Sequence, residues 1–382
     1  MKVKRKKNRK RRSYVQQRTA AYRLSGILVW ATLPILGIGA WIGSGITGEK
    51  SGTDFLPARV SASIQESADK TLAEQTPGHS FLVRQVTNIT TALGGFRVGD
   101  IYLTEDCLLE CPSLLDTDQL SETAAYLNTL YQTYQIPMCI IAVPAAGELY
   151  AEELLDGLSF PSQREEIEFF YHEMNTSIRK IDVYHVLYTM TDNYIYNRTD
   201  PRWTCYGAYA VYRSAIQKMG FAPVSFDQYT VNHVRTYRGV LYDACLYDKV
   251  TPDILDVYTC SSDIEVTNVT AYCADGTKET REMYQETDAA DPYAYYFGED
   301  CEKLVIQTSL ENQKKLLILK DSYANCMIPF LVQHYSEICV LDVSEATHAL
   351  SELADVSDYS QVLVLCDADT FADAQAFSFL EK

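Results

Sequence analysis

The sequence lacks the short motifs that mark most cofactor-dependent enzymes. It contains no Walker loop and no HExxH segment, and we expect no nucleotide, metal or other cofactor. It also lacks an internal repeat and a long low-complexity segment, which excludes solenoid and fibrous architectures. With 382 residues, the chain is long enough for one large domain or two ordinary ones.

Cysteine is present without a recognisable pattern. The eleven cysteines are odd in number and follow no disulfide framework. Cys139, Cys339 and Cys366 lie inside apolar runs, as small core residues do. Cys107 and Cys111 have no second pair and no histidine nearby, so the sequence does not predict a zinc site.

Acidic residues are absent from residues 1–48, which contain eleven Lys and Arg. Residues 49–382 therefore carry 22 basic and 51 acidic side chains, a net charge of −29. Because binding to phosphates needs a basic surface, this acidic body argues against a nucleic-acid partner.

An uncharged run of 24 residues, 24–47, is long enough to cross a bilayer. The basic residues 1–23 before it predict a cytosolic tail and a cell-membrane protein with one span and an extracytoplasmic body. A cleaved signal peptide is the alternative, because the run ends in small residues. Residues 48–90 are polar and typical of a stalk, and we expect the folded domain to occupy 91–382.

The domain alternates helical and buried strand-like patterns, which is typical of an α/β fold. A β-rich insertion is expected at about 224–313, where short strand-like runs alternate with turn residues. The expected helices are 116–135, 163–178, 204–219 and 368–380, and the expected strands are 136–143, 180–186, 316–319, 338–343 and 361–366.

The apolar run 316–319 ends at Lys320-Asp321-Ser322, and a helix-like pattern follows at once. A serine at the carboxyl end of a buried strand lies where open α/β sheets place their chemistry. Backbone N–H groups at the helix start would stabilise an oxyanion there. The alternative is that Asp321 or Ser322 only caps the helix.

Two segments together resemble a known family. TDPRWTCYGAYAVYR (199–213) resembles the Asp-His-His-Trp signature of the bacterial DHHW proteins, and KDSYANCMIPFLVQHYSEICVLD (320–342) resembles their later serine block. VGDIYLTEDCLLE (98–110) extends the likeness over most of residues 95–345. DHHW proteins are similar to the alginate O-acetyltransferases, relatives of the SGNH/GDSL esterases, so the resemblance implies an SGNH-hydrolase-like three-layer parallel sheet.

The resemblance also implies a catalytic triad, with Ser322 as nucleophile and Asp200 as the orienting acid. The family's histidine position is occupied by Arg202. A serine hydroxyl needs a nearby base, and arginine stays protonated and has no acceptor. Arg202 therefore pairs with Asp200 or binds an anionic group of a substrate.

Other residues near these segments have two interpretations each. Trp203 stacks on a sugar ring or packs in the core, and Asn325 contacts an oxyanion or faces solvent. The 28 tyrosines suit a glycan-binding groove or ordinary β-rich packing. Of the six histidines, His233 is the one retained as an alternative base.

Three function classes remain open. The first is an O-acetyltransferase or acetylesterase acting on cell-wall or exported polysaccharide through Ser322. The second is a catalytically impaired relative that binds glycan, and the third is a scaffold in an envelope O-acetylation complex, with a membrane O-acyltransferase as a further partner. The missing histidine favours slow or absent acyl transfer.

Overall fold

The computed structural model describes residues 79–110, 114–154, 161–286, 289 and 291–381. It divides into two compact units, Met1–Leu93 and Gly94–Lys382. Of the first unit it describes helix α3 (His79–Ala92). The predicted basic tail 1–23, anchor 24–47 and most of the stalk lie outside the described residues. Within the described part, no helix has both the length and the apolar character needed to cross a membrane.

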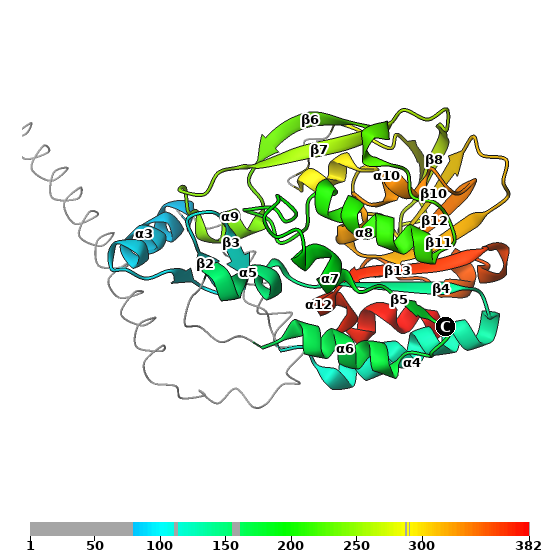
Figure 1. The fold of residues 1–382 in the computed structure, drawn as a ribbon, viewed down its shortest axis with the longest axis horizontal. Helices are drawn as coiled ribbons and strands as arrows, with labels where there is room; N and C mark the ends of the chain where they lie inside the picture. The colour runs from blue at the N-terminus through cyan, green and yellow to red at the C-terminus, as the bar shows by residue number, and fades with distance from the viewer. Residues whose placement is uncertain (1–78, 111–113, 155–160, 287–288, 290, 382) are drawn as a thin grey trace, which may run out of the picture. The chain divides into compact units, whose positions relative to one another are not determined.

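The second unit is built around an eight-stranded sheet with the order β5-β4-β13-β11-β12-β10-β8-β9 (Figure 1). The five strands from β5 to β12 are parallel, and β10, β8 and β9 extend them in antiparallel fashion. The fold is therefore α/β with a mostly parallel central sheet. The strands are β5 (Arg179–Lys180), β4 (Met138–Val143), β13 (Gln361–Asp367), β11 (Lys315–Lys320), β12 (Glu337–Asp342), β10 (Lys303–Thr308), β8 (Val266–Tyr272) and β9 (Lys278–Arg281).

The sheet is covered on both faces, as the apolar interior of its central strands predicts. In β11, Leu316 and Ile318 pack into one core, whereas Leu317 and Leu319 pack into the other. All four are fully buried, as the uninterrupted apolar run predicts. The first core also contains helix α8 (Cys205–Lys218), and the second contains α4 (Thr117–Tyr134).

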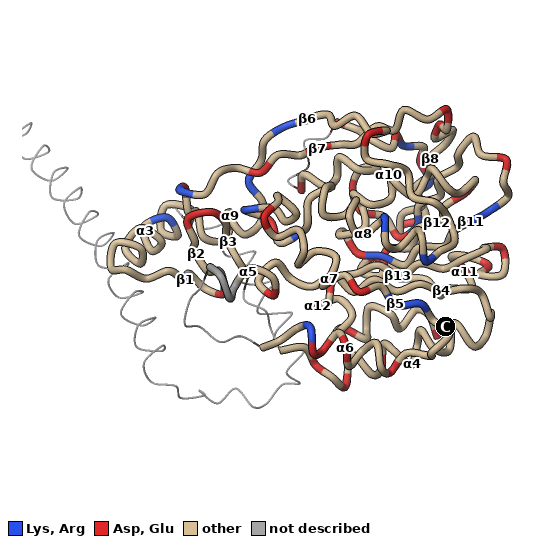
Figure 2. Tube along the Cα trace, in the orientation of Figure 1, with Lys and Arg blue, Asp and Glu red and all other residues tan. Residues whose placement is uncertain are grey.

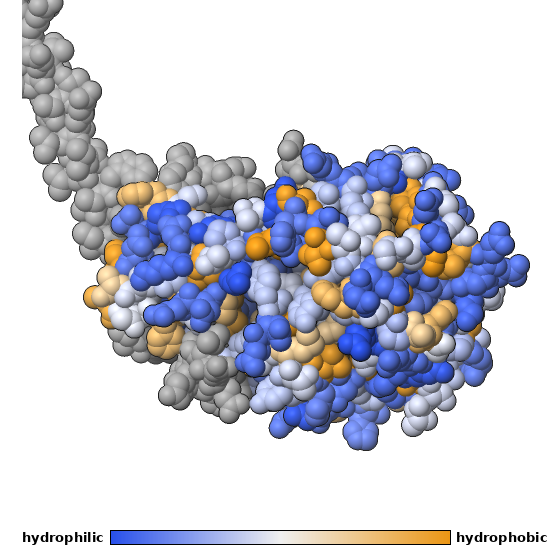
Figure 3. Space-filling model, turned by 45° about the horizontal axis from the view of Figure 1, so that its top comes forward, coloured by the Kyte–Doolittle hydropathy of each residue, from blue (hydrophilic) through white to orange (hydrophobic). Residues whose placement is uncertain are grey.

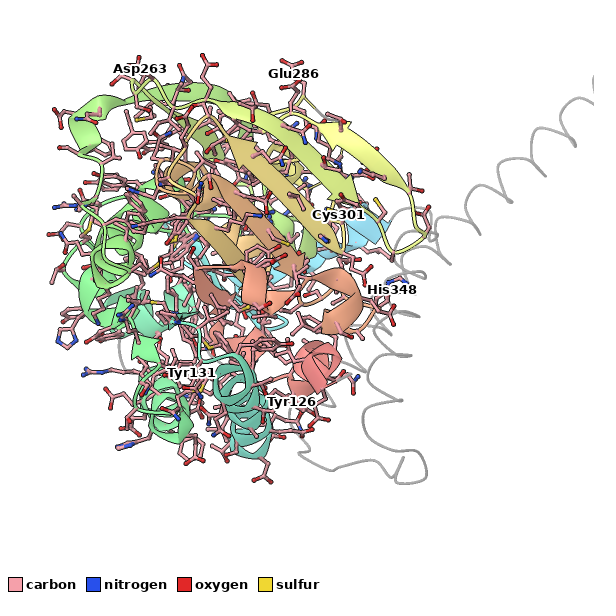
Figure 4. The ribbon with its side chains drawn as sticks, turned by 90° about the vertical axis from the view of Figure 1, so that its right-hand side faces the viewer. Tyr126, Tyr131, Asp263, Glu286, Cys301 and His348 are labelled. Carbon is pink, nitrogen blue, oxygen red and sulfur yellow. The ribbon has the colours of Figure 1, made fainter. Side chains whose placement is uncertain are left out.

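The remaining elements surround these layers (Figure 1). Figure 4 shows α4, which carries Tyr126 and Tyr131, below the sheet. The other helices are α5 (Ala146–Leu154), α6 (Gln163–Glu173), α7 (Val183–Tyr188), α9 (Val240–Cys245), α10 (Ile328–Leu331), α11 (Leu350–Leu353) and α12 (Ala368–Phe371). The 3-10 helices are η1 (Phe226–Gln228), η2 (Pro292–Tyr295), η3 (Ser322–Ala324), η4 (Val356–Asp358) and η5 (Ala374–Glu381). Two further sheets contain β1 (Arg97–Val98), β2 (Ile101–Leu103) and β3 (Leu108–Glu110), and β6 (Tyr229–Tyr237) with β7 (Asp253–Cys260).

Several predicted elements differ from the structure. The strand expected at 180–186 is only the two-residue β5, because Asp182 caps α7 by accepting a hydrogen bond from the His185 N–H (3.0 Å). The helix expected after Ser322 is divided into η3 and α10, and Pro329 lies in the first turn of α10, where its missing N–H costs nothing. The predicted β-rich insertion is not one separate body, since β8, β9 and β10 continue the central sheet.

Charged residues are distributed throughout the described part of the Gly94–Lys382 unit. Figure 2 marks acidic residues on helices and loops throughout the Gly94–Lys382 unit, with Lys and Arg scattered among them. On the face seen in Figure 3, hydrophobic patches are small and separated by hydrophilic surface.

Candidate functional site

β11 ends at Lys320, and after Asp321 the chain reaches Ser322, which opens the turn η3 at the carboxyl edge of the sheet. Asp321, not Ser322, caps this turn: its Oδ1 accepts from the Tyr323 N–H at 2.9 Å, and its Oδ2 accepts from the Asp367 N–H at 2.7 Å. The cap is therefore confirmed, and it leaves the serine side chain uninvolved. Ser322 is half-buried, and no described residue forms a hydrogen bond with its hydroxyl.

The second signature segment lies against this turn, and Tyr323 joins the two. The Trp203 indole Nε1–H donates to the Tyr323 carbonyl oxygen at 2.8 Å. The Tyr323 hydroxyl donates to the Pro201 carbonyl oxygen at 3.0 Å, and the Trp203 and Tyr323 rings meet edge to face with centroids 6.1 Å apart. The structure thus brings together two segments that the resemblance assigns to one site.

Helix α8 fixes the position of the second segment. Thr204 caps it, with its hydroxyl accepting from the Gly207 N–H at 3.3 Å, and the chain after it turns at Gly220 with a φ of +92°. Both features were predicted. Trp203 is fully buried in the core beneath α8, so the geometry favours core packing over sugar stacking for this residue.

Arg202 is enclosed by two carboxylates. Its Nε–H and an Nη2–H donate to Asp200 at 2.8 Å each, and its backbone N–H donates to the same carboxylate at 3.1 Å. On its other edge, Nη1 and Nη2 donate to Asp291 at 2.9 and 2.7 Å. The guanidinium carbon lies 3.8 Å from the centroid of the Tyr293 ring. Of the two interpretations of Arg202, the geometry favours pairing with Asp200 over an open anion site.

The electrostatics keep Arg202 charged. Arg202 is 5% exposed and Asp200 is 1% exposed. Burial alone would lower the pKa of Arg202, but the hydrogen bonds and charges of Asp200 and Asp291 raise it well above its usual range. Burial would likewise raise the pKa of the Asp291 carboxyl, and Arg202 lowers it instead. Position 202 therefore supplies a permanent positive charge and no proton acceptor.

A second buried carboxylate shapes the loop that carries Asp200. Asp253, at the start of β7, is completely buried. It accepts hydrogen bonds from the Tyr194 hydroxyl (2.6 Å), the Arg198 N–H (2.6 Å) and the Thr199 N–H (2.9 Å). Sequence reasoning missed Asp253, Asp291 and Tyr323. The capping sequence Asp291-Pro292 indicates a turn, but nothing in it indicates Arg202 as a partner.

Acidic and basic side chains also gather at the carboxyl ends of β11, β12 and β13. Burial and the neighbouring Asp367 raise the pKa of the Asp321 carboxyl to about 8. Burial raises the pKa of Asp367 to about 6. Lys320 forms a buried ion pair with Asp342, and Asn325, 6% exposed, lines a cavity of about 20 Å³ together with Lys320. The described residues contain no cluster of three or more His, Cys, Asp or Glu that could hold a metal ion.

None of the five histidines with described side chains hydrogen-bonds to Ser322. His233, the alternative base, pairs with Asp256 on the exposed β6–β7 sheet. His334 is buried against the Tyr212 hydroxyl (2.7 Å), and burial lowers its pKa to about 4. His185 and His348 pair with Asp182 and Glu302, and Figure 4 shows His348 on the outer side of the molecule.

Comparisons with known proteins show which solved structures this fold resembles. The chain resembles a DHHW family protein from Eubacterium siraeum (22% identity, TM-score 0.64, covering 74% of this chain and 97% of the other). It also resembles Bacillus cereus PatB1, solved with a sulfonyl adduct (20% identity, TM-score 0.61, covering 73% and 97%). The O-acetyltransferase domain of Pseudomonas putida AlgJ matches at 14% identity and a TM-score of 0.45, covering 74% and 98%.

A search of curated proteins gave no match. The sequence model of the DHHW proteins matches residues 86–341, which include Asp200, Arg202 and Ser322. Because this match covers more than half of the 382 residues, the chain belongs to the DHHW protein family.

Proposed function

We propose that this protein acts in the O-acetylation of a cell-envelope polysaccharide and that acyl transfer by its own Ser322 is slow or absent. In this proposal the domain is anchored by residues 24–47 and works on the outer side of the cell membrane. Ser322 occupies the nucleophile position and Asp200 that of the orienting acid. The DHHW membership and the likeness to PatB1 support the fold in which such chemistry occurs.

The observation that carries the proposal is the pairing of Arg202 with both Asp200 and Asp291. For a serine to attack an acetyl carbonyl, its Oγ–H proton must pass to a base as the new C–O bond forms. Arg202 holds the position that the family gives to that base, and it cannot accept a proton. Both carboxylate oxygens of Asp200 accept hydrogen bonds from the guanidinium, so Asp200 orients no imidazole.

The second candidate function is non-catalytic glycan binding or a scaffold role in an envelope O-acetylation complex. A groove of about 510 Å³ favours the glycan-binding form. It runs between the end of β7, β8, β9 and α10, and its lining includes Tyr284, Thr267, Asn268 and Gln333. Hydroxyl and amide groups beside an aromatic ring suit the hydroxyls and the apolar face of a sugar.

Acetyl-ester hydrolysis tests the proposal directly. Hydrolysis of an aryl acetate and of an acetylated glycan would be measured for the body 49–382 and for three variants of it. The variants are Ser322→Ala, Arg202→His and, as a control at an exposed serine, Ser261→Ala. We expect the unmodified protein to match Ser322→Ala. Hydrolysis that persists in Ser261→Ala but disappears in Ser322→Ala would show a working base and overturn the proposed impairment.

A covalent probe gives a second measurement. An aryl sulfonyl fluoride should label Ser322 no faster than it labels an unactivated serine. If labelling reaches the rate typical of serine esterases, an unrecognised base acts on Ser322.

A further inference from the structure

We infer that Asp291 is a second positioning residue of the site. Its carboxylate keeps a basic side chain at position 202 in the protonated form. Replacing Arg202 by histidine alone would then leave the imidazole protonated, and a neutral base would need a change at Asp291 as well. This inference rests on the proposed function, because it concerns the base that Ser322 lacks.

The first step is the geometry around Arg202. Asp200 and Asp291 take four of its five guanidinium N–H groups, each carboxylate through two oxygens. Tyr293 covers the flat face of the guanidinium. A side chain placed at position 202 is therefore surrounded by two negative charges rather than the single one that a triad uses.

The second step is that Asp291 is held in place independently of Arg202. Its Oδ1 caps η2 by accepting from the Tyr293 N–H at 2.9 Å. The Tyr293 hydroxyl in turn donates to the Trp203 carbonyl oxygen at 2.6 Å and accepts from the Asn197 side-chain amide at 3.0 Å. Replacing the guanidinium breaks none of these bonds, so the carboxylate stays beside position 202.

The third step is chemical. A general base must be neutral to accept the serine proton. A histidine at position 202 would have Asp200 on one side and Asp291 on the other, and both stabilise the imidazolium. The charges of Asp300, Tyr237 and Cys326 also interact with Arg202, and that of Lys320 interacts with Asp291. Lys320 opposes the two carboxylates, but its charge is already matched by Asp342.

The test compares Arg202→His, Asp291→Asn, Arg202→His/Asp291→Asn and Arg202→His/Asp300→Asn in the full chain. Asp300 is the matched control, because its charge acts on Arg202 without a hydrogen bond to it. Nuclear magnetic resonance titration of the new imidazole gives its pKa. We expect removal of the Asp291 charge to lower that pKa by about one unit, a tenfold change in the neutral fraction near pH 7, and the Asp300 change to lower it by much less.

The second readout is labelling of Ser322 by an aryl sulfonyl fluoride. The serine Oγ–S bond forms, the S–F bond breaks with loss of fluoride, and the serine proton passes to the imidazole. We expect Arg202→His/Asp291→Asn to label about tenfold faster at pH 7 than Arg202→His alone, in step with the neutral fraction.

An imidazole pKa that is the same with and without Asp291 would overturn the inference. A lower pKa with no faster labelling would support the role of Asp291 and count against the serine chemistry of the proposed function. If Asp291→Asn unfolds η2, Asp291→Ser provides the second variant, because serine keeps a capping oxygen without the charge.

Discussion

The surroundings of Asp321 have opposite effects on the ionisation of its carboxyl group. As the cap of η3 and the acceptor of the Asp367 N–H, it is best ionised. Its burial next to Asp367 favours the protonated form and raises its pKa to about 8. The neighbouring Asp367 carboxyl has a pKa raised to about 6. The residue just before Ser322 therefore changes charge near neutral pH.

This raised pKa predicts how stability depends on pH. Between about pH 4 and pH 8 the Asp321 carboxyl is protonated in the folded protein and ionised in the unfolded chain, so its contribution to the free energy of unfolding should fall as pH rises through that window. Over the whole window the loss from Asp321 alone corresponds to about 6 kcal/mol. Urea unfolding at pH 5, 6.5 and 8 measures it.

Asp321→Asn should flatten this pH dependence because it removes the titrating group. Asp263→Asn, an exposed position on a loop (Figure 4), is the control and should retain the wild-type slope. A slope that Asp321→Asn leaves unchanged would assign the titration to another group.

Tyr323 determines how Ser322 is held against the second segment. Tyr323→Phe keeps the ring on Trp203 but removes the hydrogen bond to the Pro201 carbonyl oxygen. We expect it to lower the free energy of unfolding by about 1 kcal/mol. Tyr188→Phe, at a tyrosine that is 55% exposed, should change it by much less. Equal losses in the two variants would mean that the Tyr323 hydroxyl contributes nothing specific.

At the scale of elements, the helix start at α9 is packed directly against the loop carrying Asp200. Gly239 caps α9, and its N–H donates to the Thr199 hydroxyl at 2.9 Å. A Cβ at position 239 would lie 2.4 Å from the Asp200 Cβ and 2.7 Å from the Thr199 carbonyl oxygen. The absence of a side chain at Gly239 is what lets Asp200 reach Arg202.

Gly239→Ala should therefore destabilise the protein by about 1–3 kcal/mol, because the loop must move to relieve the contact. It should also disturb the Asp200–Arg202 pair. Thermal and urea unfolding measure the first effect. Val240→Ala, at the next residue, is 55% exposed and should cost about 0.5 kcal/mol or less. A Gly239→Ala variant as stable as Val240→Ala would show that the loop carrying Asp200 moves away from the new side chain at little cost in free energy.

The elements also show what the sequence could predict. The cap Thr204, the apolar face of α8 and Gly220 are local signals, and the helix lies where they place it. The apolar runs of β4, β11, β12 and β13 likewise mark buried strands without any knowledge of their neighbours. Long, strongly patterned elements were predictable for this reason.

The rest depended on long-range contacts. The pairing of Arg202 with Asp291 spans 89 residues, and that of Asp253 with Thr199 spans 54. No sequence pattern links such positions in a single chain. The incorporation of β8, β9 and β10 into the central sheet was missed for a similar reason, since the alternation of a strand does not reveal which sheet it joins.

At the scale of the molecule, the three hydrophobic clusters formed by the described residues, 79–381 with their gaps, consist of residues from Val98 onward. We therefore expect a chain that begins at Gly94 to fold by itself and to unfold in one cooperative transition. Circular dichroism melting and binding of a hydrophobic dye measure this, with the full chain as the reference. A broad transition or strong dye binding by the shorter chain would show that the preceding residues are needed for the fold.

The bonds that join the two signature segments end on main-chain oxygens. Trp203 donates to the carbonyl of Tyr323, and Tyr323 donates to the carbonyl of Pro201. A carbonyl oxygen is the same in every residue, so these two hydrogen bonds do not depend on the identity of the side chain at position 202. A substitution at position 202 can therefore change the charge there without breaking either of these two hydrogen bonds.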